Sequence, residues 1–147
     1  MRKELSEAIK TQLEPYFDNV EFREPLWEKV TKFPVLMILY DHDDTTLYVN
    51  NKVNHKMNFK IYYVDKRLSE KSEQAEWDAL DAIEFIRSTL DWKHFNVKID
   101  GVNIVVLGRI VSDNLTRSLI GNSGMYYTLI GDIDYTCEFI VPTDMRI

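Results

Sequence analysis

The sequence is poor in cysteine and glycine. Cys137 is the single cysteine among 147 residues, so the chain cannot form an internal disulfide, and a zinc site built from cysteine thiolates is excluded. Five glycines are present, and they cannot be assembled into a phosphate-binding loop or a dinucleotide-binding fingerprint. We therefore expect no cofactor, and nothing in the composition indicates an oxidising compartment.

Long hydrophobic runs and a basic surplus are also missing. The densest apolar run, Val35–Tyr40, has the size of a strand and is far shorter than the ~20 residues of a membrane span. The N-terminal sequence MRKELSEAIK lacks the apolar segment of a signal peptide. Acidic residues outnumber basic ones by 24 to 18, for a net charge of −6, which argues against broad nucleic-acid binding. We predict a soluble protein made in a cytosol, without a membrane partner.

The residues that are present suffice for one hydrophobic core. Hydrophobic residues make up 45% and aromatic residues 12% of the chain, which is an ordinary globular profile. A chain of about 150 residues can bury such a core without disulfides or metal ions. The sequence contains no internal repeat, linker or low-complexity segment, so we predict a single domain over residues 1–147.

Two segments have the periodicity of amphipathic helices, 2–17 and 72–90. Ser72 is the expected N-cap of the second helix. The buried stripe of that helix is predicted to consist of Ala79, Ala82, Ile83, Ile86 and Leu90, widened by Trp77, Leu80 and Phe85.

Segments of alternating or dense apolar character predict strands. They are residues 19–24, 34–40, 45–49, 57–64, 95–99, 102–106 and 125–141. Asp100-Gly101 between two of them is a type I′ hairpin signature. Turns or loops are expected at 41–44, 50–56, 65–72 and 112–123. This order predicts an α+β fold, with a mostly antiparallel sheet and two amphipathic helices packed on one face.

The run Asp41-His42-Asp43-Asp44 is a candidate metal site, but consecutive side chains cannot all point at one ion. A solvated turn explains the run better. The three histidines, His42, His55 and His94, fall in separate segments without a metalloprotease motif.

Two further groups could carry chemistry. Gly121-Asn122-Ser123-Gly124 resembles the sequence around the nucleophile of chymotrypsin-like proteases, for which His42 and Asp44 could serve as partners. However, the chain is short for the double-barrel fold of those proteases, and its two amphipathic helices have no place in that fold. Asp132 and Asp134 lie about 6.5–7 Å apart on one strand face and could do acid–base work. Cross-strand pairing with Lys60 or Lys98 explains them better, and we expect no enzyme.

The long last strand and the polar segment 50–56 favour an interaction protein instead. Long strands with apolar ends suit contact between subunits, and unlike surfaces on identical copies can close into a ring. The expected contact residues are Asn50, Asn51, Lys52, Val53, Asn54, Tyr126 and Ile140.

The order of elements resembles that of the tail terminator, or head-to-tail joining, proteins of long-tailed bacteriophages. The matching features are MRKELSEAIKTQLEPYF, Phe33-Pro34 leading into VLMILYD, then NFKIYYVD, SEQAEWDALDAIEFIRSTL and YYTLIGDIDYTCEFIVP. The resemblance covers most of the chain as a pattern, without a diagnostic motif.

This resemblance implies a homohexameric ring in the virion, at the junction of head and tail, assembled in the cytoplasm of a bacterial host. Its partners would be the tail tube protein and the head connector protein, with DNA passing through the lumen without sequence readout. It implies no catalytic residues. Asp132 and Asp134 would contribute a negative lumen that repels DNA. Alternatives are a head completion or minor capsid protein, a small metal-dependent or serine hydrolase, and a monomeric binding module.

Overall fold

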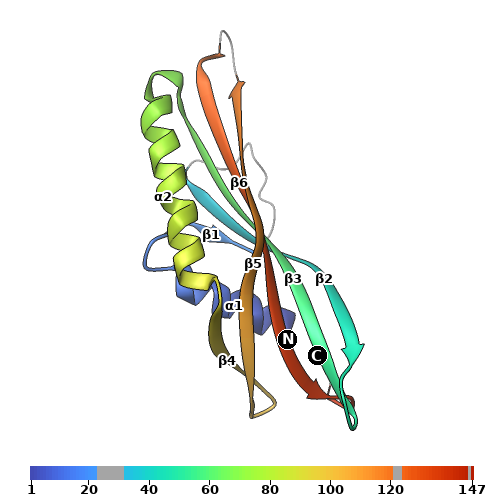
Figure 1. Cartoon of the computed structure of the whole chain (residues 1–147). Helices are drawn as coiled ribbons and strands as arrows, with labels where there is room; N and C mark the ends of the chain where they lie inside the picture. The colour runs from blue at the N-terminus through green and yellow to red at the C-terminus, as the bar shows by residue number, and fades with distance from the viewer. Residues whose placement is uncertain (23–31, 121–123, 146) are drawn as a thin grey trace.

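The computed structural model describes residues 1–22, 32–120, 124–145 and 147 and has an α+β fold (Figure 1). In chain order the elements are α1 (Arg2–Leu13), β1 (Val20–Glu21), β2 (Val35–Leu47), β3 (Lys52–Leu68), the 3₁₀ turn η2 (Ser69–Lys71), α2 (Ser72–Leu90), β4 (Lys93–Ile99), β5 (Val102–Ile120) and β6 (Tyr126–Pro142). The strands form one six-stranded sheet in the order β1-β2-β3-β6-β5-β4. The β1–β2 pair is parallel and the other pairs are antiparallel, so the sheet is mixed.

Both helices pack against the same face of this sheet. Leu5, Ile9 and Leu13 of α1 and the predicted stripe of α2 share one core with alternate residues of the strands, because successive strand residues point to opposite faces. In the described part of the chain, the opposite face has a small second cluster, built around Val35, Met37 and Val64. The prediction that two helices lie on one face is confirmed, although α1 ends at Leu13, before Pro15, rather than at residue 17.

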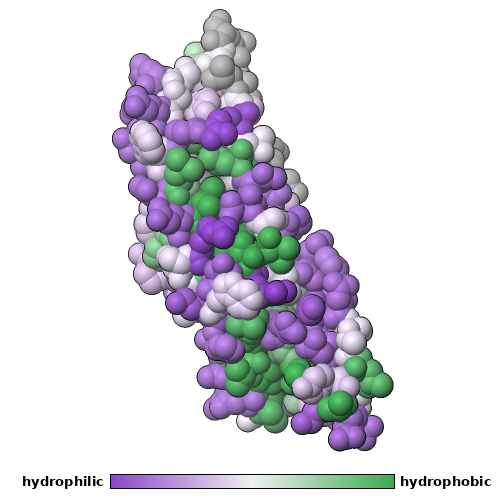
Figure 2. All heavy atoms as spheres, viewed as in Figure 1, coloured by the Kyte–Doolittle hydropathy of each residue, from purple (hydrophilic) through white to green (hydrophobic). Residues whose placement is uncertain are grey.

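The sheet is much longer than the helices that cover it. Strand β3 has 17 residues, or roughly 56 Å at about 3.3 Å per residue, whereas the 19 residues of α2 span roughly 28 Å at about 1.5 Å per residue. The strands therefore continue past the helices (Figure 1). Figure 2 shows hydrophobic surface at the lower end of the molecule, where β5, β6 and the β2–β3 hairpin end.

Two of the predicted turns are wrong. Residues 41–44 continue β2, with a register shift between Tyr40 and His42. The predicted loop at 112–123 is strand as far as Ile120, with a similar shift between Ile110 and Ser112. Each shift is a β-bulge, which changes the face to which the following residues point. The strands therefore keep pairing although the simple alternation along the sequence is interrupted.

The other predicted connections are shorter than expected. The β2–β3 turn is made by Asn50 and Asn51, with φ of 46° and 63°, and residues 52–56 already belong to β3. Residues 65–68 also belong to β3. Ser72 is the first residue of α2 rather than its cap, and no side chain caps that end. The hairpin at Asp100-Gly101 is confirmed, with φ of 50° and 78° as a type I′ turn requires.

Candidate subunit interface

A hollow opens where strands β5 and β6 separate. The ladder between them stops at the pair Leu107–Glu138, although β5 begins at Val102 and β6 runs to Pro142. Beyond this pair, β5 is bonded on its other side to β4, and β6 on its other side to β3. Among the described residues, no ladder pair joins the two facing strand edges. Two edges with free backbone groups therefore border the same space.

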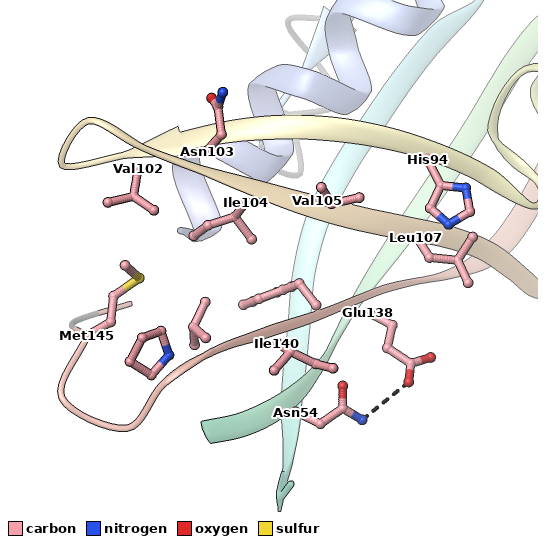
Figure 3. Close-up of a pocket in the computed structure, with 13 residues that line it drawn as sticks. Asn54, His94, Val102, Asn103, Ile104, Val105, Leu107, Glu138, Ile140 and Met145 are labelled. Atoms are coloured by element: carbon pink, nitrogen blue, oxygen red, sulfur yellow. Dashed lines mark hydrogen bonds between the residues drawn. The ribbon is translucent and has the colours of Figure 1, made fainter. Parts of the chain in front are cut away.

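This hollow has a volume of about 430 Å³ and a mostly apolar lining. Val102, Ile104 and Met145 border the space at its open end (Figure 3). Val105 and Ile140, which are 60% and 44% exposed, line it on the sheet face away from the helices. Polar groups contribute at the rim, among them His94, Asn103 and Glu138. The hollow therefore presents uncovered apolar surface to solvent.

The structure brings most of the predicted contact residues to this end of the sheet. Asn54 and Ile140 are cross-strand neighbours and both line the hollow, and the Asn54 amide donates a hydrogen bond to Glu138 at 3.2 Å (Figure 3). Lys52 and Val53 pair with the last residues of β6.

Tyr126 lies elsewhere. It begins β6, fourteen residues before Ile140 and therefore roughly 46 Å away at about 3.3 Å per residue. There the Lys66 ammonium lies 4.5 Å from the centre of its ring. The predicted contact residues thus belong to two surfaces, one at each end of the sheet.

Three consecutive apolar residues at the β2–β3 turn complete the lower surface. Leu47, Tyr48 and Val49 are 73%, 55% and 53% exposed, and with Asn50 and Asn51 they form what we call the tip. The Thr143 amide donates a hydrogen bond to the Asn51 carbonyl at 2.8 Å, which holds the tip beside the end of β6. Residues 47–49 were not among the predicted contact residues, although each of their side chains is more than half exposed. An apolar triplet directly before an Asn-Asn turn was the available signal.

Asp132 and Asp134 lie on the sheet face away from the helices, since their neighbours Ile133 and Tyr135 are in the core. Lys60 of β3 forms an ion pair with Asp134, and the Ser112 hydroxyl donates a hydrogen bond to the same carboxylate at 2.8 Å. The hydrogen bond from Lys60 lowers the pKa of Asp134. The expected cross-strand pairing is present, and Asp134 is held as a carboxylate.

The Asp41–Asp44 run is divided between the two faces of the sheet. His42 contacts Asp41 through Nδ1 at 2.9 Å and Asp44 through Nε2 at 3.2 Å. Asp43 instead contacts Nδ1 of His55 at 2.7 Å. In the described part of the chain, no group of three or more His, Cys, Asp or Glu side chains is placed to hold a metal ion. His94 lines the hollow, and Ser123 of the protease-like motif lies outside the described residues.

The contact with Asp41 has a measurable consequence for His42. The hydrogen bond that the imidazole donates to the Asp41 carboxylate raises the pKa of exposed His42 above its usual 6.5. This pair therefore contributes stability that is fully present below pH 6.5 and is lost as the pH rises through the raised pKa. In an NMR titration we expect Asp41→Asn to lower the pKa of His42. Asp81→Asn, on the exposed side of α2, is the control and should leave it unchanged. An equal pKa in both variants would contradict this assignment.

Among the residues that the structure describes, neither helix combines the length and the apolar character needed to cross a membrane. No protein-family model matches the chain, and the search of curated proteins finds no match.

Proposed function

We propose that the protein is a structural subunit of a bacteriophage tail, forming a ring that ends the tail tube and joins it to the head connector. The observation that carries this proposal is the sheet that extends beyond both helices and leaves apolar side chains uncovered at its two ends. A joining ring needs surfaces of this kind, because each subunit must contact neighbouring copies and also partners above and below the ring.

The uncovered side chains are large and lie at or directly beside the ends of the strands. At one end of the sheet lie Leu47, Tyr48 and Val49 of the tip. At the other end lie Leu68 and Met125, 42% and 50% exposed, where the Ser69 amide donates a hydrogen bond to the Met125 carbonyl at 2.9 Å. Contiguous exposed apolar surface of this kind marks sites of protein association.

The two surfaces at the lower end are unlike each other, since the tip projects and the hollow recedes. Contact between unlike surfaces on identical copies is heterologous, and such contacts generate a ring when the rotation closes. The sheet face with Asp132 and Asp134 would line the lumen, where carboxylates repel the phosphates of passing DNA. The net charge of −6 agrees with passage of DNA rather than with its retention.

Light scattering after size-exclusion chromatography, combined with negative-stain microscopy, tests the proposal. We expect a discrete species of about six chain masses and annular particles with a central channel. Purified tail tube protein and head connector protein should bind opposite faces of these particles. Binding to a capsid protein instead would favour the head completion or minor capsid alternative. A monomer at every protein and salt concentration, with or without assembled tubes, would contradict the proposal.

A further inference from the structure

We infer that the hollow between β5 and β6 receives the tip of a neighbouring copy of this chain. The inference rests on the proposed function, because it identifies the contact by which the ring would close. It has three supports: the free strand edges around the hollow, the apolar character of both surfaces, and the positions of the two surfaces in one molecule.

The backbone around the hollow is suited to a further strand. Residues 102–106 of β5 bond to β4 on one side only, and residues 139–141 of β6 bond to β3 on one side only. Their remaining amide and carbonyl groups face the space between the strands. The tip is the turn of the β2–β3 hairpin, so one side of Leu47 is already paired with β3. Its other side can add main-chain hydrogen bonds to one of the two edges of the hollow, as in other cases of strand addition.

The side chains of the two surfaces agree in character. The hollow is lined by Val102, Ile104 and Val105 on one strand and by Ile140 on the other. The tip offers Leu47, Tyr48 and Val49, each more than half exposed. In a single copy Val102, Val105 and Ile140 are 48%, 60% and 44% exposed, whereas Ile104 is buried. Docking of the tip would remove the exposed apolar side chains of both surfaces from water. A polar rim with His94, Asn103 and Glu138 matches the polar border of known interfaces.

A chain cannot fill its own hollow with its own tip. Strand β3, which leads out of the tip, is paired with β6 from Lys52–Pro142 onward, on the edge of β6 opposite the hollow. The tip is also bonded to Thr143, just beyond β6. The tip and the hollow therefore lie at the same end of the molecule but on opposite sides of β6. Copies related by rotation about a ring axis place such surfaces at equal height, so the tip of one copy can meet the hollow of the next.

Disulfide trapping between two variants that each carry one introduced cysteine tests this contact. The native Cys137 is fully buried, so it does not compete. Tyr48→Cys places a thiol in the tip, and Val105→Cys places one in the hollow. Mixing the two variants under mild oxidation should give a cross-linked dimer containing one copy of each. Val111→Cys is the matched control, because Val111 is on the same strand and is 63% exposed against 60% for Val105, but it lies outside the hollow.

Val105→Asp provides a second readout, with Val111→Asp as its control. We expect Val105→Asp to remain folded by circular dichroism but to lose the oligomer completely, whereas Val111→Asp should retain it. If rings form but Tyr48→Cys cross-links equally to Val105→Cys and Val111→Cys, the inference is overturned and the proposed function stands. Cross-linking of Tyr48→Cys only with itself would also overturn it, since the contact would then be symmetric. A monomer without any cross-link would overturn both proposals.

Discussion

Replacement of Arg67 by methionine is expected to lower the free energy of unfolding by about 3–5 kcal/mol, the usual effect of removing one partner from a buried ion pair. Asp65 on β3 is 1% exposed. Its carboxylate lies 2.8 Å from Nε of Arg67, and Nη2 of Arg67 lies 2.6 Å from Asp78 of α2. Without the guanidinium, a buried carboxylate would face no opposite charge, and α2 would lose one of its links to the sheet. Urea denaturation followed by circular dichroism measures the loss.

The pH dependence of this loss distinguishes an orphaned charge from lost packing. Burial raises the pKa of Asp65, and Arg67 opposes that rise. Removal of Arg67 should raise the pKa of Asp65 further. The Asp65 carboxylate of the folded variant should then bind a proton at a pH where the same carboxylate in the unfolded chain does not. Stability of the variant should therefore increase as the pH falls through the raised pKa toward the lower pKa that Asp65 has in the unfolded state. The double variant Asp65→Asn, Arg67→Met should recover part of the loss at pH 7. A loss that is equal at pH 5 and pH 7 would contradict the explanation.

The same type of interaction explains why residues 112–120 were not recognised as a strand. Asp113 and Arg117 occupy positions of β5 that face α2, where apolar residues were expected. Asp113 pairs with Arg87 and Arg117 pairs with Glu76, so both charges are compensated by the helix. A pattern of apolar alternation cannot detect positions at which the partner is a charge on a distant element. Knowledge of the register between α2 and β5 would have been required.

Local signals were sufficient for the elements that depend on their own residues. The five-residue apolar stripe of α2, the Asp100-Gly101 turn and the long strand β6 were all predicted from sequence, and the structure confirms them. The expectation that Trp77 and Leu80 widen this stripe is wrong, because these side chains are 58% and 43% exposed. Asn54 was predicted as a contact residue because it belongs to the polar segment 50–56, and Ile140 because it belongs to the apolar end of the last strand. Their position beside a hollow was not predictable, because the hollow exists only where the β5–β6 ladder stops. The end of a ladder is a property of two strands and their bulges together.

Gly108→Ala is expected to destabilise the protein by about 3 kcal/mol or more, which combines overpacking of a core with loss of a buried hydrogen bond. Gly108 of β5 lies against Tyr135, and an added Cβ would stand 1.7 Å from the Tyr135 hydroxyl oxygen and 2.5 Å from Cζ. Tyr135 is fully buried, and its hydroxyl donates a hydrogen bond to the Leu90 carbonyl at 3.3 Å. The ring cannot move away without breaking this link between β6 and the end of α2. Thermal and urea denaturation measure the loss.

A double-mutant cycle tests the steric explanation. Tyr135→Phe removes the atom nearest to the added Cβ, so Gly108→Ala should cost less in the Tyr135→Phe background than in the native chain. Gly131→Ala on β6 is the matched control. A Cβ there would meet Ile83 and Tyr63 at 3.4 Å, which is ordinary contact, and we expect a change of less than about 1 kcal/mol. Additive costs in the cycle would contradict the assigned clash. Leu107, the first residue of β5 that pairs with β6, directly precedes Gly108, so the clash acts at the base of the hollow. Gly131 lies away from the hollow, so Gly131→Ala should not disturb assembly.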